Sequence, residues 1–141
     1  MDSTLFSLAI VTPEKDFFES EVNEVVFSTS EGSVGIMAGH EPLFAAVSEG
    51  VVEIFVDGEW KIAAVGQGFC EVSYHKTKFY LDTAEWADEI DIVRAKEALE
   101  RAAQRIQSSL SQLEYIRTQA ALSRALARLK ATESSAAHHG H

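Results

Sequence analysis

Arginine is the residue type in this sequence whose number and spacing best suit it to chemistry, and all six arginines lie after position 90. They form two triplets with the same spacing of seven and four residues: Arg94, Arg101, Arg105 and Arg117, Arg124, Arg128. Steps of seven and four keep side chains on one face of an α-helix. A guanidinium group stays charged and binds phosphate or carboxylate oxygens through two hydrogen bonds at once. The pattern therefore predicts two helices, each with a basic face.

Three interpretations of these basic faces stay open. The first is a solvated surface with no ligand, which is common for charged helix faces. The second is an anion site in which a folded helical hairpin brings Arg94, Arg101, Arg124 and Arg128 around one polyphosphate. The third is an extended basic helix that docks into an acidic groove of a larger partner. The residue pattern does not choose among them.

Other residue types suggest neither catalysis nor a metal site. The sequence has no nucleophile elbow, no two-glycine phosphate loop and no zinc-binding helix, so we expect no catalytic residues. We interpret His40, which precedes Glu41, as a structural or interface histidine, and the histidines of residues 138–141 as an incidental polar terminus. The lone Cys70 alternates with Val72, which predicts a buried small hydrophobe and excludes a disulfide framework.

The elements that carry the arginines are two predicted helices. Asp88 is a candidate N-cap, with Asp91 at the third helical position as in a capping box. Apolar residues then recur every three or four positions in two stripes: Ile92, Ala95, Leu99, Ala102, Ile106 and Tyr115, Leu122, Leu126, Leu129. The serine-rich residues 108–112 between the stripes predict a turn. An alanine-rich seam permits close packing of the two helices as an antiparallel hairpin.

Before about Ala84 the pattern is that of short β-strands. Two β-branched and aromatic runs, Val51–Val56 and Trp60–Val65, flank Asp57-Gly58, which predicts a two-residue hairpin whose turn needs positive φ. Further strands are expected in four other runs: Leu5–Val11, Val22–Thr29, Phe69–Tyr74 and Phe79–Thr83. Many short strands at this spacing indicate an antiparallel sandwich or flattened barrel.

The distribution of charge divides the 141 residues at about the same place as the strand and helix patterns do. Residues 1–89 hold 17 acidic residues against four lysines, a net charge of −13, whereas residues 90–141 hold five against eight basic residues, a net charge of +3. The acidic part would repel nucleic acid. The sequence has no apolar run of membrane-spanning length and no visible signal peptide, so we expect a soluble intracellular protein.

The motifs in their order resemble the epsilon subunits of bacterial F-type ATP synthases, along the chain to about Glu133. Four segments carry the resemblance: Ser30–Ile36, Gly39–Leu43, Gly68–Val72 and Leu81–Ala84. Gln67 stands where the family commonly has glycine. The resemblance implies an α+β fold, with an N-terminal antiparallel β-sandwich of about ten strands followed by a C-terminal antiparallel two-helix hairpin. The corresponding domains are residues 1–84, residues 85–133 and a flexible tail at 134–141.

The resemblance also implies a non-catalytic subunit of the rotor stalk. The sandwich would contact the gamma subunit and the c-ring, and by family position Glu31, Ser33 and His40 are candidates for that contact. The C-terminal helices would reach the alpha and beta subunits of the catalytic head and inhibit ATP hydrolysis. The expected location is peripheral, on the cytoplasmic face of the bacterial plasma membrane.

A subset of the family known from bacilli resembles the chain more closely. Its ATP-binding motif matches Ile90-Asp91-Ile92-Val93-Arg94-Ala95 at every fixed position. By this resemblance Arg94, Arg101, Arg124 and Arg128 would hold the phosphates of ATP, while Asp91 and nearby backbone would contact the nucleoside. A family glutamate falls on Glu85. ATP is thus the expected regulatory ligand of the folded hairpin, with the need for Mg²⁺ open. The alternative function is a stand-alone ATP-sensing module.

Overall fold

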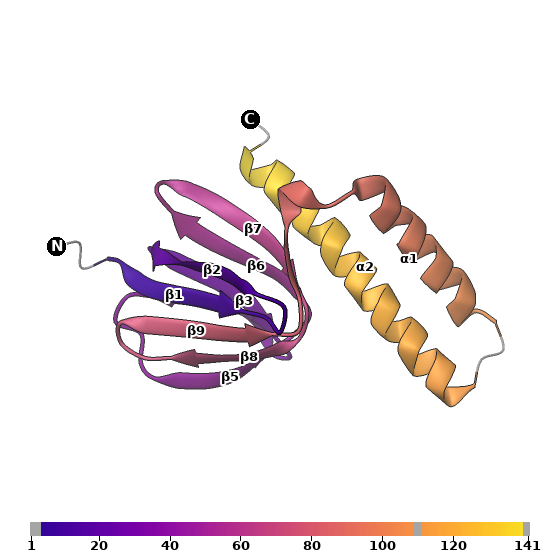
Figure 1. Cartoon of the computed structure of the whole chain (residues 1–141), viewed down its shortest axis with the longest axis horizontal. Coiled ribbons are helices and arrows are strands. Elements are labelled where there is room, and N and C mark those ends of the chain that lie inside the picture. The colour runs from indigo at the N-terminus through magenta and orange to yellow at the C-terminus, as the bar shows by residue number, and fades with distance from the viewer. Residues whose placement is uncertain (1–3, 109–110, 140–141) are drawn as a thin grey trace.

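A computed structural model describes residues 4–108 and 111–139 of the chain, which form a β-sandwich with a helical hairpin at one end (Figure 1). The sandwich contains ten strands: β1 (Phe6–Val11), β2 (Asp16–Val22), β3 (Glu24–Thr29), β4 (Gly32–Met37), β5 (Leu43–Val47), β6 (Gly50–Val56), β7 (Glu59–Val65), β8 (Gly68–Val72), β9 (Lys76–Leu81) and β10 (Ala84–Trp86). The run Val22–Thr29, expected as one strand, is divided at Asn23, which separates β2 from β3.

Two five-stranded sheets make up the sandwich, in the orders β2-β1-β9-β8-β5 and β10-β7-β6-β3-β4. The predicted antiparallel arrangement is confirmed for every pair but one. Strands β1 and β9 run parallel, with Ser7 opposite Lys76 and Val11 opposite Tyr80. This pair brings the first and the penultimate strands of the sandwich together, so that the β1–β2 hairpin joins the first sheet through residues 69 positions further along the chain, as from Ser7 to Lys76.

Large apolar side chains fill the space between the sheets. Phe27 from one sheet and Phe79 from the other are almost completely buried, and their rings meet edge to face with centroids 5.1 Å apart. Cys70 is fully buried among them, as its alternation predicted, and burial raises the pKa of its thiol to about 11. A thiol in this environment stays protonated and unreactive at neutral pH.

The β6–β7 hairpin has the turn that the sequence predicts. Asp57 and Gly58 have φ values of 52° and 76°, as a two-residue turn of this hand requires. At the start of β8, a side chain on Gly68 would overlap the carbonyl oxygen of Tyr80 on the paired strand β9. Glycine is therefore the residue that lets these two backbones approach.

The helical part begins with a short 3₁₀-helix, η1 (Ala87–Glu89), followed by α1 (Ile92–Ile106) and α2 (Gln112–His139). The predicted N-cap at Asp88 is wrong, because the chain makes the η1 turn there and only then enters α1. Asp91 is the N-cap, and its carboxylate accepts a hydrogen bond of 3.1 Å from the backbone N–H of Arg94. The helix α2 continues to His139, past the end of the predicted helical domain at residue 133.

The hairpin packs on the sandwich through α2, which lies against β6, β7 and η1, while α1 lies on the outer side of α2 (Figure 1). A second, smaller core joins the two parts and consists mainly of small side chains: Ile62, Ala64, Ala87, Ile90, Ala95 and Ala131.

The predicted apolar stripes are only partly buried. Ala95 and Ala102 are buried as expected, but Ile92 is 47% exposed, Tyr115 45% and Leu126 50%. The other large residues of the stripes are partly buried: Leu99, Ile106, Leu122 and Leu129. The buried contacts of the helices are made largely by alanine, because small side chains let backbones approach closely. No helix in residues 4–108 and 111–139 is long and apolar enough to cross a membrane.

Candidate functional site

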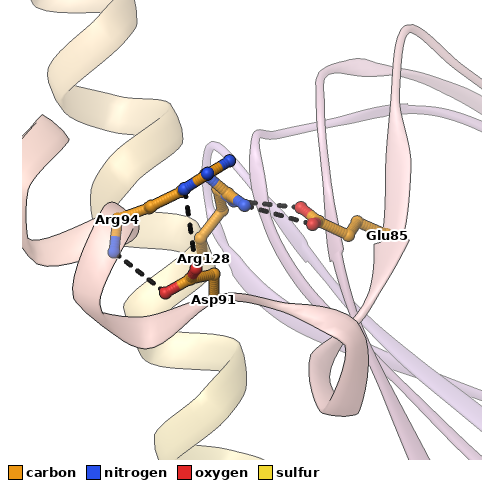
Figure 2. A network of polar contacts seen from close by, with 4 residues as sticks. All are labelled: Glu85, Asp91, Arg94 and Arg128. Atoms are coloured by element: carbon orange, nitrogen blue, oxygen red, sulfur yellow. Dashed lines mark hydrogen bonds and ion pairs between the residues drawn. The ribbon is translucent and has the colours of Figure 1, made fainter.

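An ion pair between residues 43 positions apart in the sequence connects the hairpin to the sandwich. Arg128 of α2 donates from Nε to one Glu85 carboxylate oxygen at 2.9 Å and from a terminal nitrogen to the other at 3.1 Å (Figure 2). Glu85 is held in place by β10, where it lies opposite Ala64 of β7. Both side chains are about one-third exposed, so water partly screens the pair. The two planar groups match in the bidentate geometry that arginine and carboxylate favour.

The Glu85–Arg128 pair borders a cavity of about 330 Å³ between the sandwich and the hairpin, which we call the interface cavity. Alanines from both helices and from β7 make much of its wall, and its charged residues are two arginines and two glutamates. The lining residues are Glu49, Ala64, Val65, Thr83, Glu85, Ala98, Ala121, Arg124, Ala125, Ala127 and Arg128. A ligand that presents both anionic groups and hydrogen-bond donors suits this lining.

Glu49 is a residue of the interface cavity that sequence reasoning missed. It lies in the bend between β5 and β6, and partial burial raises the pKa of its carboxyl above the ordinary value of 4.5. Arg124 opposes this shift and Asp82 adds to it. Nothing in the local pattern Ser48-Glu49-Gly50 distinguishes Glu49 from a surface turn residue, because its neighbours come from α2 and from the β9–β10 turn.

The motif residues at the start of α1 lie at the helix N-terminus. Ile90 is buried in the second core, whereas the side chains of Asp91 and Arg94 are 55% and 84% exposed. Arg94 is turned back toward the Asp91 carboxylate, with a separation of 3.6 Å between the charged atoms (Figure 2). The exposed Arg94 guanidinium is therefore free to reorient toward a ligand at modest cost.

Arg101 does not line the interface cavity. It lines a second cavity, of about 400 Å³, between α1 and α2, which also contains Arg105 and Arg117. Ala98 and Ala121 line both cavities, so the two are neighbours along the helical seam. The structure thus brings Glu85, Arg124 and Arg128 to one cavity and Arg101 to the neighbouring one, while Arg94 lines neither.

The three residues expected to contact rotor partners do not form one patch. Glu31 lies in the β3–β4 turn and Ser33 follows on β4, both exposed at the edge of a sheet. His40 lies beyond the other end of β4, where its Nδ1 is 2.7 Å from the carbonyl oxygen of Glu41. The six residues of β4 lie between Glu31 and His40, a length of about 20 Å. Among the described residues, no group of three or more histidine, cysteine, aspartate or glutamate side chains is placed to hold a metal ion.

Comparison with known families covers nearly the whole described chain. Residues 5–87 match the family profile of the ATP synthase delta/epsilon chain, beta-sandwich domain, and residues 88–133 match that of the delta/epsilon chain, long alpha-helix domain. The chain is 46% identical over 127 residues to the ATP synthase epsilon chain of Ruminiclostridium cellulolyticum, covering 90% of this chain and 95% of that one. It is 42% identical over 131 residues to the ATP synthase epsilon chain of Caldanaerobacter subterraneus, with 92% and 94% coverage.

Solved structures share the fold at lower sequence identity. A chain of the Euglena gracilis mitochondrial ATP synthase, in a structure of OSCP, F1 and c-ring, superposes with a TM-score of 0.79 at 22% identity, covering 96% of this chain and 82% of that one. A chain of the Tetrahymena thermophila mitochondrial ATP synthase central stalk and c-ring gives a TM-score of 0.65 at 16% identity, with 94% and 99% coverage. The α+β fold of sandwich and helical hairpin is therefore confirmed.

Proposed function

The chain belongs to the ATP synthase delta/epsilon family, and from this premise we propose that it works in the rotor stalk as a regulatory subunit whose folded hairpin binds ATP. As an epsilon chain it is a stalk subunit of ATP synthase and not a catalytic one. The regulatory step is then a change in the position of the hairpin, controlled by a nucleotide at the interface cavity.

The proposed partners are the gamma subunit, the c-ring and the alpha and beta subunits of the catalytic head. The Euglena and Tetrahymena structures that share the fold contain F1 or central stalk together with c-ring, which supports this assignment. Because Glu31 and Ser33 lie at the opposite end of β4 from His40, we expect them to meet different surfaces of these partners. In the assembled enzyme the chain would lie at the cytoplasmic face of the bacterial plasma membrane, held there through the complex.

The Glu85–Arg128 pair beside Arg124 is the observation that carries the ATP proposal. Arg124 and Arg128 lie four positions apart on α2 and therefore point from one face, as two contacts to neighbouring phosphates require. The carboxylates of Glu85 and Glu49 would repel phosphate but accept hydrogen bonds from ribose hydroxyls or an adenine amine. The small alanine side chains leave a flat apolar wall for the base.

ATP binding at this position would favour the docked hairpin. The cavity takes its walls from β7, α1 and α2 together, so it exists only while the hairpin lies on the sandwich. A ligand that binds only the docked form shifts the equilibrium toward that form by its differential affinity. Without ATP the hairpin would leave the sandwich and extend its basic faces into the catalytic head, where it would inhibit ATP hydrolysis.

Calorimetric titration of the chain with ATP and ADP tests the proposal. We expect saturable binding that favours ATP and weakens at least about tenfold in Arg124→Ala, since a hydrogen bond to a charged group contributes about 1.5–3 kcal/mol. Lys130→Ala is the matched control, because Lys130 is an exposed cation on the same helix outside the interface cavity. Equal loss in both variants would indicate non-specific charge attraction, and no binding at physiological ATP would refute the nucleotide site. Titrations with and without Mg²⁺ decide whether the ligand is the free or the metal-bound nucleotide.

Removal of the hairpin tests the inhibitory role. A chain that ends after Glu89 keeps all ten strands and η1 but loses α1 and α2. Reconstituted with the other subunits, it should give faster ATP hydrolysis than the full chain when ATP is scarce. An unchanged hydrolysis rate would contradict the inhibitory role while leaving the place of the sandwich in the stalk intact.

A further inference from the structure

Two carboxylates line the interface cavity, and the structure holds them in different ways. Arg128 faces Glu85 and donates a hydrogen bond to each of its oxygens (Figure 2). Glu49 makes neither an ion pair nor a side-chain hydrogen bond within residues 4–108 and 111–139. Of the two carboxylates, Glu49 is therefore the one whose negative charge no direct contact compensates.

The backbone around Glu49 is fixed on both sides. The N–H of Ser48 donates to the carbonyl oxygen of Ser28 on β3 at 2.9 Å, and Gly50 begins β6 opposite Val65 of β7. Glu49 itself is half-buried. Its carboxylate is thus held beside the interface cavity by two neighbouring strands, and it cannot move far into water without breaking their pairing.

The charged groups around Glu49 come from several elements. Partial burial is the main influence on the pKa of its carboxyl and raises it, whereas Arg124 of α2 lowers this pKa and Asp82 of the β9–β10 turn raises it. Helix α1 contributes only Ala98 to the wall of the cavity. Glu49 also lines an adjoining groove of about 380 Å³ between α2 and strands β3, β4 and β6. The other charged residues of the cavity and the groove are Glu85, Arg128, Glu53 and Lys130.

A nucleotide phosphate bound at Arg124 would change the surroundings of Glu49 in two ways. The guanidinium group would direct its charge toward the phosphate, so it would attract the Glu49 carboxylate less. The phosphate would also add negative charge to the cavity that Glu49 lines. Both changes favour the neutral, protonated form of Glu49. When a group gains a proton on binding, the affinity for the ligand rises as the pH falls.

We propose that Glu49 takes up a proton when ATP binds at the interface cavity, so that acidification strengthens nucleotide binding. The inference rests on the proposed function, because it concerns regulation of the same cavity. The proton passes from solvent to the Glu49 carboxylate, and no bond of ATP is broken. At a given ATP concentration, a fall in pH would favour the docked hairpin and a rise in pH would favour its release.

Calorimetric titration of the full chain with ATP at pH 6 and pH 8 tests this coupling. Glu49→Gln keeps the shape of the side chain without its charge, and should bind ATP about three- to tenfold more tightly than the wild-type chain at pH 8. This difference should become smaller at pH 6. Glu53→Gln is the matched control, since Glu53 lies on the same strand but lines the groove and not the interface cavity. Its affinity should stay within about twofold of the wild-type value at both pH values.

The number of protons taken up is a second readout. Titrations at pH 6 in two buffers with different heats of ionisation give the protons bound per ATP. The wild-type chain and Glu53→Gln should take up more protons than Glu49→Gln. Protons that belong to ATP itself contribute alike to all three chains, so the comparison between variants isolates Glu49.

The opposite results have distinct meanings. The same pH dependence and proton uptake in the wild-type chain and Glu49→Gln would overturn the coupling and leave ATP binding in place. Weaker binding by Glu49→Gln would also overturn it, since Glu49 would then act as a charged hydrogen-bond acceptor for the nucleotide. No ATP binding by any of the three chains would refute the nucleotide site and the coupling with it.

If Glu49→Gln alters the fold by circular dichroism, the wild-type chain alone decides. Carbon-13 NMR follows the titration of the Glu49 carboxyl directly. Its midpoint should move to higher pH in saturating ATP. A midpoint that ATP does not move would contradict the coupling even where ATP binds.

Discussion

The sandwich and the helical hairpin of this chain are held together in different ways. Inside the sandwich, Phe27 and Phe79 pack edge to face and are at most 1% exposed. Between the sandwich and the hairpin, the buried side chains are mainly alanines, joined by the Glu85–Arg128 ion pair. The core of the sandwich consists of large apolar side chains, whereas at the interface with the hairpin small buried side chains lie near the charged pair of Glu85 and Arg128.

This difference predicts two levels of stability in one molecule. Burial of a large apolar side chain stabilises a fold by about 1.5–3 kcal/mol, and an alanine methyl contributes much less. The hairpin interface also contains cavities of about 330 and 380 Å³, whose lining atoms lose packing contacts. The hairpin should therefore detach while the sandwich stays folded, as the proposed regulatory role requires.

The largest expected effect is on the sandwich core. Phe79→Ala should lower the free energy of unfolding of the sandwich by about 3–5 kcal/mol, because it removes a fully buried ring and leaves a cavity. Urea unfolding followed by β-sheet circular dichroism measures the change. Leu126→Ala, at a half-exposed position, is the control and should cost less than about 1 kcal/mol. A similar cost for both would remove the distinction between the two regions.

The next effect is on the alanine-rich interface between α2 and the sandwich. Ala131→Leu inserts a larger side chain at a fully buried position between α2 and the sandwich, and should weaken docking by about 1–3 kcal/mol without changing the sandwich. Hydrogen exchange of the α1 and α2 amides, compared with those of β6, measures it. Ala120→Leu makes the same change at an exposed position of the same helix and should have little effect. Faster exchange in β6 as well would show that the two regions unfold as one unit.

Local sequence pattern predicted the parts of the fold that local forces determine. Asp57-Gly58 identified the β6–β7 hairpin because the turn needs positive φ. The serines of residues 108–112 predicted the turn between α1 and α2, of which positions 109 and 110 lie outside the described residues. Strand β2 was missed because its exposed, polar residues give no clear alternation. Strands β4, β5 and β10 were not located by the pattern either, and the family resemblance implied only the total of about ten strands.

The site was harder to predict than the fold, because tertiary contacts define it. Glu85 and Arg128 lie 43 positions apart, and only the resemblance placed them in one set. Glu49 was missed because its role depends on Arg124 from another element. The spacing of the arginines predicted helix faces correctly but did not show that Arg101 and Arg124 line different cavities.

A smaller effect is expected at the ion pair between the two regions. Glu85→Gln removes the charge that faces Arg128 and should weaken docking by about 1 kcal/mol, since the pair is bidentate but partly exposed. High salt should reduce docking in the wild-type chain and have little effect in the variant. Glu89→Gln, at an exposed position of η1, is the control. Salt sensitivity that survives in Glu85→Gln would show that other charges hold the hairpin.

The smallest effect concerns the pH dependence of docking through Glu49. Partial burial raises the pKa of Glu49, so the folded chain holds that proton more tightly than the unfolded chain, and stability falls as pH rises through the raised pKa. Glu49→Gln should therefore stabilise docking slightly at pH 7. The gain should vanish below pH 4.5, the ordinary pKa of a glutamate carboxyl, where the glutamate of the wild-type chain is neutral like the glutamine of the variant. Thermal unfolding at several pH values measures the difference. A gain that is the same at all pH values would exclude this cause.

Native-state hydrogen exchange with and without ATP tests the central claim most directly. Without ATP, the amides of α1 and α2 should exchange through an opening that leaves the core strands β3, β6 and β9 protected, and saturating ATP should slow exchange in the helices alone. Equal opening free energies for helices and strands, or helix exchange that ATP does not slow, would contradict the account of a hairpin held on a stable sandwich by a nucleotide.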